Sequence, residues 1–118
     1  MRNQKVAMNE RRANRLNWRM EQGKLYAETY VEKKLLDTFK VKFELVPTSG
    51  ETAVLIENLW DKKLSMNKTQ CKDFETAVNE VNAFFNRMDE LIDKMPLEAR
   101  SRAYNAYRKE IARAIESI

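Results

Sequence analysis

Apolar residues recur at helical spacing through the first third of the chain. The positions that keep this spacing are Val6, Ala13, Leu16, Met20, Ala27, Val31 and Leu35. Residues three and four apart share one face of an α-helix, so this narrow stripe predicts an amphipathic N-terminal helix. Gly23 interrupts the stripe, either as a left-handed helix cap or as a glycine inside one long helix. The stripe keeps its phase across Gly23, which favours the long helix.

The apolar period then shortens to two residues. Phe39, Val41, Phe43 and Leu45 alternate with the charged residues Lys40, Lys42 and Glu44. Such alternation is typical of a half-buried β-strand. The turn-forming residues 47–50 and a second aliphatic segment, 52–58, follow, so we predict a β-hairpin. Residues 61–63 can turn the chain again into a short third strand at 64–66.

Two helices are predicted in the second half of the chain. Asn67, with Gln70 three residues later, has the spacing of a capping box and predicts a helix over 68–95. Its apolar face comprises Phe74, Ala77, Val78, Val81, Phe84, Phe85, Met88, Leu91, Ile92 and Met95. Pro96 ends this helix and suits the first turn of the next. The buried stripe predicted for the last helix is Leu97, Tyr104, Tyr107, Ile111, Ala114, Ile115 and Ile118.

Together these elements predict an α+β domain. Its predicted order is an N-terminal helix, a two- or three-stranded antiparallel meander and two C-terminal helices, with the 68–95 helix as the core. The 118 residues, of which 43% are hydrophobic, suffice for a single domain, 1–118. Within it we distinguish residues 1–22, a candidate basic helical arm, from an α+β core at 23–118.

The location that the sequence predicts is the cytoplasm. The N-terminus has no apolar segment typical of a secretory signal. The single cysteine, Cys71, rules out an internal disulfide framework. The longest aliphatic run, 53–56, is far shorter than the ~20 residues of a membrane-spanning helix, so no membrane partner is expected.

No catalytic or metal-binding constellation stands out in the sequence. Histidine, the commonest general base and metal ligand, is absent, so Cys71 has no imidazole partner. Asp89 and Asp93 share a helix face, but carboxylates from one turn of one helix are more typical of a solvated surface. Gly23 and Gly50 stand alone, so no glycine-rich loop can cradle a phosphate. We therefore expect a protein that is not an enzyme, with no cofactor, metal or small-molecule substrate.

The distribution of charge is more informative than the net charge of +4. Residues 1–24 contain seven Lys or Arg and two Glu, whereas residues 25–96 contain ten basic and thirteen acidic residues. Residues 97–118 contain five basic and three acidic residues. Positive charge thus concentrates at both ends of the sequence, which favours an anionic partner.

On a helical wheel, the cations of the N-terminal segment fall on one face. An arc of roughly 120° holds Lys5, Arg11, Arg12, Arg15, Arg19, Gln22, Tyr26, Tyr30 and Lys33, with Trp18 at its border. Arginine is suited to recognition because its planar guanidinium binds phosphates and carboxylates in bidentate fashion and stacks on flat rings. Two alternatives stay open: the solvated polar face of an ordinary helix, and a helix lying on a membrane surface.

Two smaller basic surfaces add to this face. Lys40 and Lys42 project from the outer side of the predicted hairpin. In the last helix Arg102, Lys109 and Arg113 share a face, with Arg108 at its edge. The candidate binding residues are therefore Arg11, Arg12, Arg15, Trp18, Arg19, Tyr26, Tyr30, Lys40, Lys42, Arg102, Lys109 and Arg113.

Two classes of function fit this pattern. The first is binding to DNA or RNA, or action on the machinery that handles them, with arginines on phosphates and Trp18, Tyr26 or Tyr30 stacked on bases. Small meander-plus-helix domains that bind nucleic acid provide a fold-level analogy only. The second is an inhibitor or adaptor of the phage or mobile-element type, which binds and occludes a host protein. The arginines of this chain would then contact an acidic surface of that host protein. Two copies could also pair through the long helices, although no sustained heptad run requires a homodimer.

Overall fold

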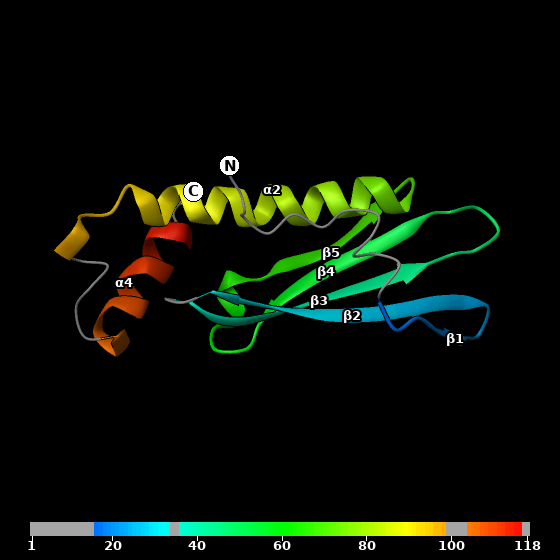
Figure 1. Cartoon of the computed structure of the whole chain (residues 1–118), viewed down its shortest axis with the longest axis horizontal. Coiled ribbons are helices and arrows are strands. Elements are labelled where there is room, and N and C mark those ends of the chain that lie inside the picture. Colours follow the sequence, from blue (N-terminus) through cyan, green and yellow to red (C-terminus); the bar gives the residue numbers. More distant parts are fainter. Residues whose placement is uncertain (1–15, 34–35, 99–103, 117–118) are drawn as a thin grey trace.

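A five-stranded antiparallel sheet with helices packed on it forms the described part of the chain, residues 16–33, 36–98 and 104–116 of a computed structural model (Figure 1). The strands are β1 (Arg19–Glu21), β2 (Lys24–Lys33), β3 (Asp37–Leu45), β4 (Thr52–Asn58) and β5 (Met66–Cys71). The helices are the 3-10 helix η1 (Lys62–Leu64) and the α-helices α2 (Phe74–Asp93) and α4 (Tyr104–Glu116).

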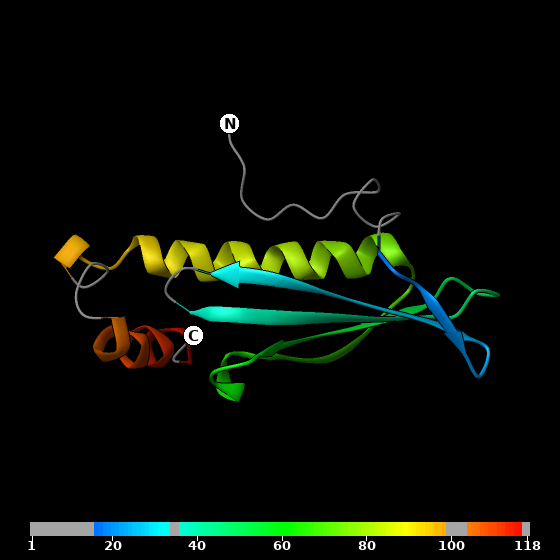
Figure 2. The same ribbon diagram turned by 60° about the horizontal axis from the view of Figure 1, so that its bottom comes forward.

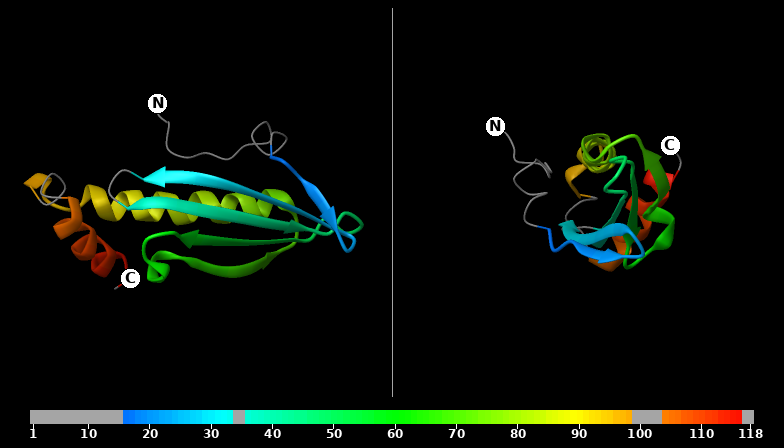
Figure 3. Two further views of the ribbon diagram at one scale, coloured as in Figure 1. Left: turned by 90° about the horizontal axis from the view of Figure 1, so that it is seen from below. Right: turned by 90° about the vertical axis from the view of Figure 1, so that its right-hand side faces the viewer.

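The strands follow one another in sequence order across the sheet, and each pairs antiparallel with its neighbour. Figures 2 and 3 show α2 lying lengthwise over one face of the sheet, while no other described element covers the opposite face. α4 packs beside η1 and α2 at one end of the sheet. Alternate residues of each strand therefore face either α2 or solvent.

The core lies between the sheet and α2. Phe39, Val41 and Phe43 of β3 are buried and face the helix. Phe85 of α2 packs edge-on against Phe39, with ring centroids 5.2 Å apart. The buried residues of α2 are Ala77, Val78, Val81, Phe85 and Met88, which confirms the core face predicted for this helix.

The element order predicted from the sequence is wrong at its start. Residues 19–33 form β1 and β2, and not an N-terminal helix, so the meander has five strands. A two-residue turn joins β1 to β2, with Gln22 at φ 51° and Gly23 at φ 82°. Positive φ at both positions suits such a hairpin, because the twist of the turn then matches that of the strands. Gly23 is thus a hairpin glycine, while residues 1–15 of the predicted arm lie outside the described residues.

The rest of the meander agrees with the prediction only in part. The β3–β4 hairpin is confirmed, with Leu45 opposite Thr52. The strand predicted at 64–66 is instead β5, which begins at Met66. Leu64 belongs to η1, where its side chain is buried.

The start of α2 also differs from the prediction. Asn67 and Gln70 lie in β5, so they do not form a capping box. The N-cap is Asp73, whose Oδ1 accepts a 2.8 Å hydrogen bond from the Thr76 backbone N–H. Aspartate at this position satisfies a helix N–H that would otherwise lack a partner. The helix spans Phe74–Asp93, shorter at both ends than predicted.

A buried arginine joins α4 to the sheet. Arg108 is 8% exposed, and its Cζ lies 4.1 Å from the centroid of the Trp60 ring. Its Nη2 donates a 2.8 Å hydrogen bond to Oδ2 of Asp37, at the start of β3. The prediction that Arg108 borders an exposed basic strip is therefore wrong. The predicted burial of Leu97 is wrong as well, since that residue is 71% exposed.

Candidate nucleic-acid interface

Five of the predicted binding residues lie on the open face of the sheet, opposite α2. They are Arg19, Tyr26, Tyr30, Lys40 and Lys42. Tyr26 lies opposite Arg19 on β1, and the Arg19 Cζ is 5.7 Å from the centroid of the Tyr26 ring. Tyr30 lies opposite Lys40 on β3, and the Lys40 Nζ is 5.9 Å from the centroid of the Tyr30 ring. Cross-strand pairing thus brings these residues together without the helix that the sequence predicts.

The charges of this open face are balanced. Its five cations are Arg19, Lys24, Lys40, Lys42 and Lys68, and its five glutamates are Glu21, Glu28, Glu32, Glu44 and Glu57. Salt bridges join Arg19 to Glu21 at 3.2 Å and Lys42 to Glu57 at 3.3 Å. Lys24 and Lys68 both bind Glu44, at 3.0 and 2.8 Å. A phosphate would therefore compete with carboxylates for most of these cations.

Glu44 is the centre of this network of charges. Lys68 of β5 reaches it diagonally across β4, where the residue directly opposite Glu44 is the small Ala53. Hydrogen bonds from Lys68 and then from Lys24 lower the pKa of the Glu44 carboxyl. The same carboxylate raises the pKa of Lys24. The network therefore ties β2, β3 and β5 together across the open face.

Replacing Glu44 with glutamine should lower stability at neutral pH and have little effect in acid. The pKa of Glu44 is lower in the folded protein than the value of about 4.3 expected in the unfolded chain, so the ionised carboxylate stabilises the fold at any pH above about 4.3. This stabilisation is lost as the pH falls through the pKa that Glu44 has in the folded protein. Because the pairs are partly solvated, we expect less than ~1 kcal/mol at neutral pH. Urea unfolding of both proteins between neutral and acidic pH measures this difference. A constant difference over that range would contradict the prediction, and Glu28→Gln on the same face is the matched control.

A hollow of about 210 Å³ opens on this face above Ala53. Ala53, which is 4% exposed, forms the floor of the hollow. It pairs with Glu44 of β3 on one side and with Gln70 of β5 on the other. The side chains that line the hollow are Arg19, Tyr26, Glu28, Lys42, Glu44, Leu55 and Lys68. Larger neighbours around one small residue thus create a shallow site with apolar and charged walls.

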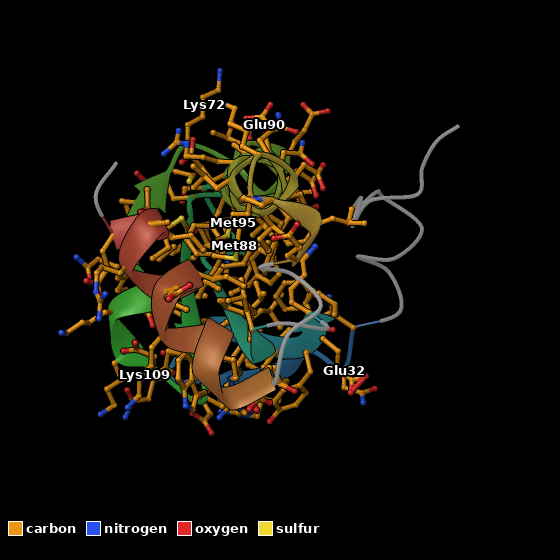
Figure 4. All side chains as sticks on the ribbon, turned by 90° about the vertical axis from the view of Figure 1, so that its left-hand side faces the viewer. Glu32, Lys72, Met88, Glu90, Met95 and Lys109 are labelled. Carbon is orange, nitrogen blue, oxygen red and sulfur yellow. The ribbon has the colours of Figure 1, made fainter. Side chains whose placement is uncertain are left out.

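A second surface lies in the groove between η1 and α4. Its volume is about 340 Å³, and it is lined by the cations Lys63, Lys109 and Arg113, the carboxylates of Asp61 and Glu116, and Trp60 and Ala112. Lys109 and Arg113 are exposed one helical turn apart, and Figure 4 shows Lys109 pointing outward from α4. Among the described residues, none of the three cations forms a salt bridge. This groove, which we call the basic groove, therefore presents cations that are free to meet an anion.

The remaining predicted residues either lie elsewhere in the fold or fall outside the described residues. Trp18 packs on the core side of the sheet, with its ring centroid 5.5 Å from that of Phe74. Lys33, which the helical wheel places on the basic face, donates a 2.9 Å hydrogen bond to Oδ1 of Asp89. Arg11, Arg12, Arg15 and Arg102 lie outside the described residues.

Sequence reasoning missed two cations of the open face, Lys24 and Lys68, and all five of its glutamates, including Glu44. Lys24 and Lys68 were not recognised as neighbours on one sheet face because the sequence analysis assigned both residues to helices. The signal that identifies Lys24 is the alternation of polar Lys24, Tyr26, Glu28, Tyr30 and Glu32 with less polar residues along β2. Lys68 and Gln70 alternate with Thr69 and Cys71 in the same way. Period-2 counting over these segments would have found them.

The described ranges contain no candidate metal-binding group and no candidate membrane-spanning helix. These residues contain no group of three His, Cys, Asp or Glu that could hold a metal ion. Their helices include none that is long and apolar enough to cross a membrane. Comparisons with known protein families, curated proteins and solved structures found no match to this chain.

Proposed function

We propose that this chain is a non-enzymatic binding protein whose partner is nucleic acid, with phosphates held at the basic groove. The observation that carries the proposal is the contrast between the two surfaces. Most cations of the open face are paired with glutamates, whereas Lys63, Lys109 and Arg113 form no salt bridge with another described residue. An incoming phosphate at the groove therefore breaks no salt bridge between described residues and meets three cations against the two carboxylates of Asp61 and Glu116.

Phosphate contacts of this kind supply sequence-independent affinity. Each neutralised phosphate releases counterions, so the binding constant falls with salt at a logarithmic slope of about 0.9 per contact on duplex DNA and about 0.7 on single strands. Arg113 can bind a phosphate in bidentate fashion, and Lys63 and Lys109 act as point charges. Arg11, Arg12 and Arg15, which lie outside the described residues, stay predicted phosphate contacts on the evidence of the sequence alone.

The experiment measures binding to labelled DNA and RNA of roughly 25 nucleotides, single- and double-stranded, by fluorescence anisotropy over a salt series. We expect the double variant Lys109→Ala/Arg113→Ala to bind roughly tenfold more weakly and with a smaller salt slope. The matched control, Lys72→Ala/Lys94→Ala, removes the same charge from the surroundings of α2 and should stay within about twofold of the wild type. Figure 4 shows Lys72 on the outer side of the molecule, far from Lys109. No binding by the wild type at low salt would overturn the proposal.

A second proposal is that the protein occludes a protein partner, as a phage-type inhibitor or adaptor would. The open sheet face favours it, because balanced charges and an exposed aromatic ring are more typical of protein surfaces than of phosphate-binding ones. Tyr30 is 55% exposed on this face. A single stoichiometric partner in a pull-down, lost in Tyr30→Ala and retained in Lys109→Ala/Arg113→Ala, would support this function over the first.

A further inference from the structure

We infer that the hollow above Ala53 is a subsite for one nucleobase of a single strand, with specificity for bases that carry an amino group. The inference rests on the proposed nucleic-acid function and assigns a site that the basic groove does not supply. Phosphate contacts at the groove carry no sequence information, whereas a base seated in a shaped hollow does.

The size of the hollow suits a small planar group. Its volume of about 210 Å³ lies below the roughly 300–1,000 Å³ of pockets that take drug-sized ligands. Ala53 gives it a flat floor, and Tyr26 and Leu55 supply aromatic and aliphatic walls. Stacking on an aromatic side chain adds affinity for a base of any identity, because every base has a π-face. One flat ring on this floor would thus be held mainly by its faces.

The charged rim adds a means of discrimination. Glu28 lines the hollow and forms no salt bridge with any other described residue, so its carboxylate is available as an acceptor. Carboxylates accept hydrogen bonds from exocyclic amino groups, such as N4 of cytosine. Thymine and uracil have no exocyclic amino group. Arg19 and Lys68, exposed at the rim, are paired with Glu21 and Glu44, so the hollow would hold the base while the phosphates are held at the basic groove.

The test is a titration of ¹⁵N-labelled full-length protein with short oligo-dC and oligo-dT, followed by amide chemical shifts. We expect the largest shifts at Tyr26, Ala53 and Leu55, and tighter binding of oligo-dC. Ala53→Leu fills the hollow and should weaken oligo-dC binding by about tenfold, since it blocks stacking. Gln70→Leu, which adds the same side chain on the neighbouring strand outside the hollow, should have less than a twofold effect. Glu28→Gln should reduce the preference for oligo-dC.

The outcomes separate this inference from the function on which it rests. Shifts confined to the basic groove, together with unchanged binding by Ala53→Leu, would overturn the base subsite and leave nucleic-acid binding intact. Equal affinities for oligo-dC and oligo-dT would overturn the specificity. Absence of any shift with either oligonucleotide at low salt would overturn both proposals. The wild-type shift map requires no variant, so the test stands even if Ala53→Leu unfolds the sheet.

Discussion

Replacing Asn58 with alanine should lower the free energy of unfolding by roughly 3 kcal/mol, because it leaves three backbone groups without partners. Asn58 ends β4 and is only 2% exposed. Its Nδ2 donates a 2.8 Å hydrogen bond to the carbonyl of Leu36. Its Oδ1 accepts from the backbone N–H groups of Trp60 and Asp61, at 2.9 and 2.6 Å. Each buried group left unpaired costs about 1–3 kcal/mol, and water entering the loops offsets part of the total.

Urea unfolding followed by circular dichroism measures this effect as a lower midpoint at an unchanged slope. The matched control is Asn86→Ala on the exposed side of α2, which should stay within ~0.5 kcal/mol of the wild type. Equal midpoints for the two variants would show that the Asn58 hydrogen bonds contribute nothing.

Asn58 also connects the fold to the candidate interface. The loop that it holds contains Trp60 and Asp61 and continues into η1, which supplies Lys63 to the basic groove. Asp61 in turn caps η1 through a 3.0 Å hydrogen bond from the Lys63 backbone N–H. Asn58→Ala should therefore speed amide hydrogen exchange through residues 60–64 before the strands exchange.

The N-terminal half shows why the sequence pattern was ambiguous. Residues four apart share a face in a helix and also in a strand, so Tyr26 and Tyr30 were grouped correctly from a wrong structure. Leu25, Ala27 and Val31 alternate with polar residues, but Met20, Ala27 and Val31 also have helical spacing and continue the predicted helical stripe across Gly23. β2 forms nine residue pairs with β3, and this long-range pairing makes the segment a strand because it outweighs the weak local propensity for a helix.

β5 was missed for a different reason. Its sequence, Met-Asn-Lys-Thr-Gln-Cys, has little apolar content because it is an edge strand, paired only with β4 in the described sheet. Asn67 and Gln70 have the spacing of a capping box by chance. The helix was therefore predicted to begin at residue 68, which lies within β5. The segments with strong periodicity, the β3–β4 hairpin and the core face of α2, were predicted correctly.

The candidate interface was predictable only as a set of charges. Composition identifies Lys109 and Arg113 as basic residues of an amphipathic helix, and the structure places them in the basic groove. Whether a cation is free or paired depends on contacts distant in sequence, such as Lys68 with Glu44 or Arg108 with Asp37. Arg108 resembled its neighbours in the sequence, yet it lies stacked on Trp60 within the fold.

Trp18→Ala should lower the free energy of unfolding by roughly 3 kcal/mol while leaving nucleic-acid binding by the folded protein nearly unchanged. The sequence assigns Trp18 to base stacking at the border of an exposed arc. In the structure its ring lies on the α2 side of the sheet, 6.4 Å from Phe43 and 5.5 Å from Phe74 between centroids. Removing the ring would detach the segment before β1 from the core and open a cavity beside Phe74.

Thermal unfolding and anisotropy, measured on the same protein, separate the two roles of Trp18. Trp18→Phe keeps an aromatic ring in the cluster with Phe43 and Phe74, so it should retain most of the stability that alanine loses. Both variants should bind nucleic acid within about twofold of the wild type at temperatures where they are folded, because neither changes the open face or the basic groove. A large loss of affinity in Trp18→Ala without a loss of stability would instead mean that the ring leaves the core to stack on a base, and would contradict its assignment as a packing residue.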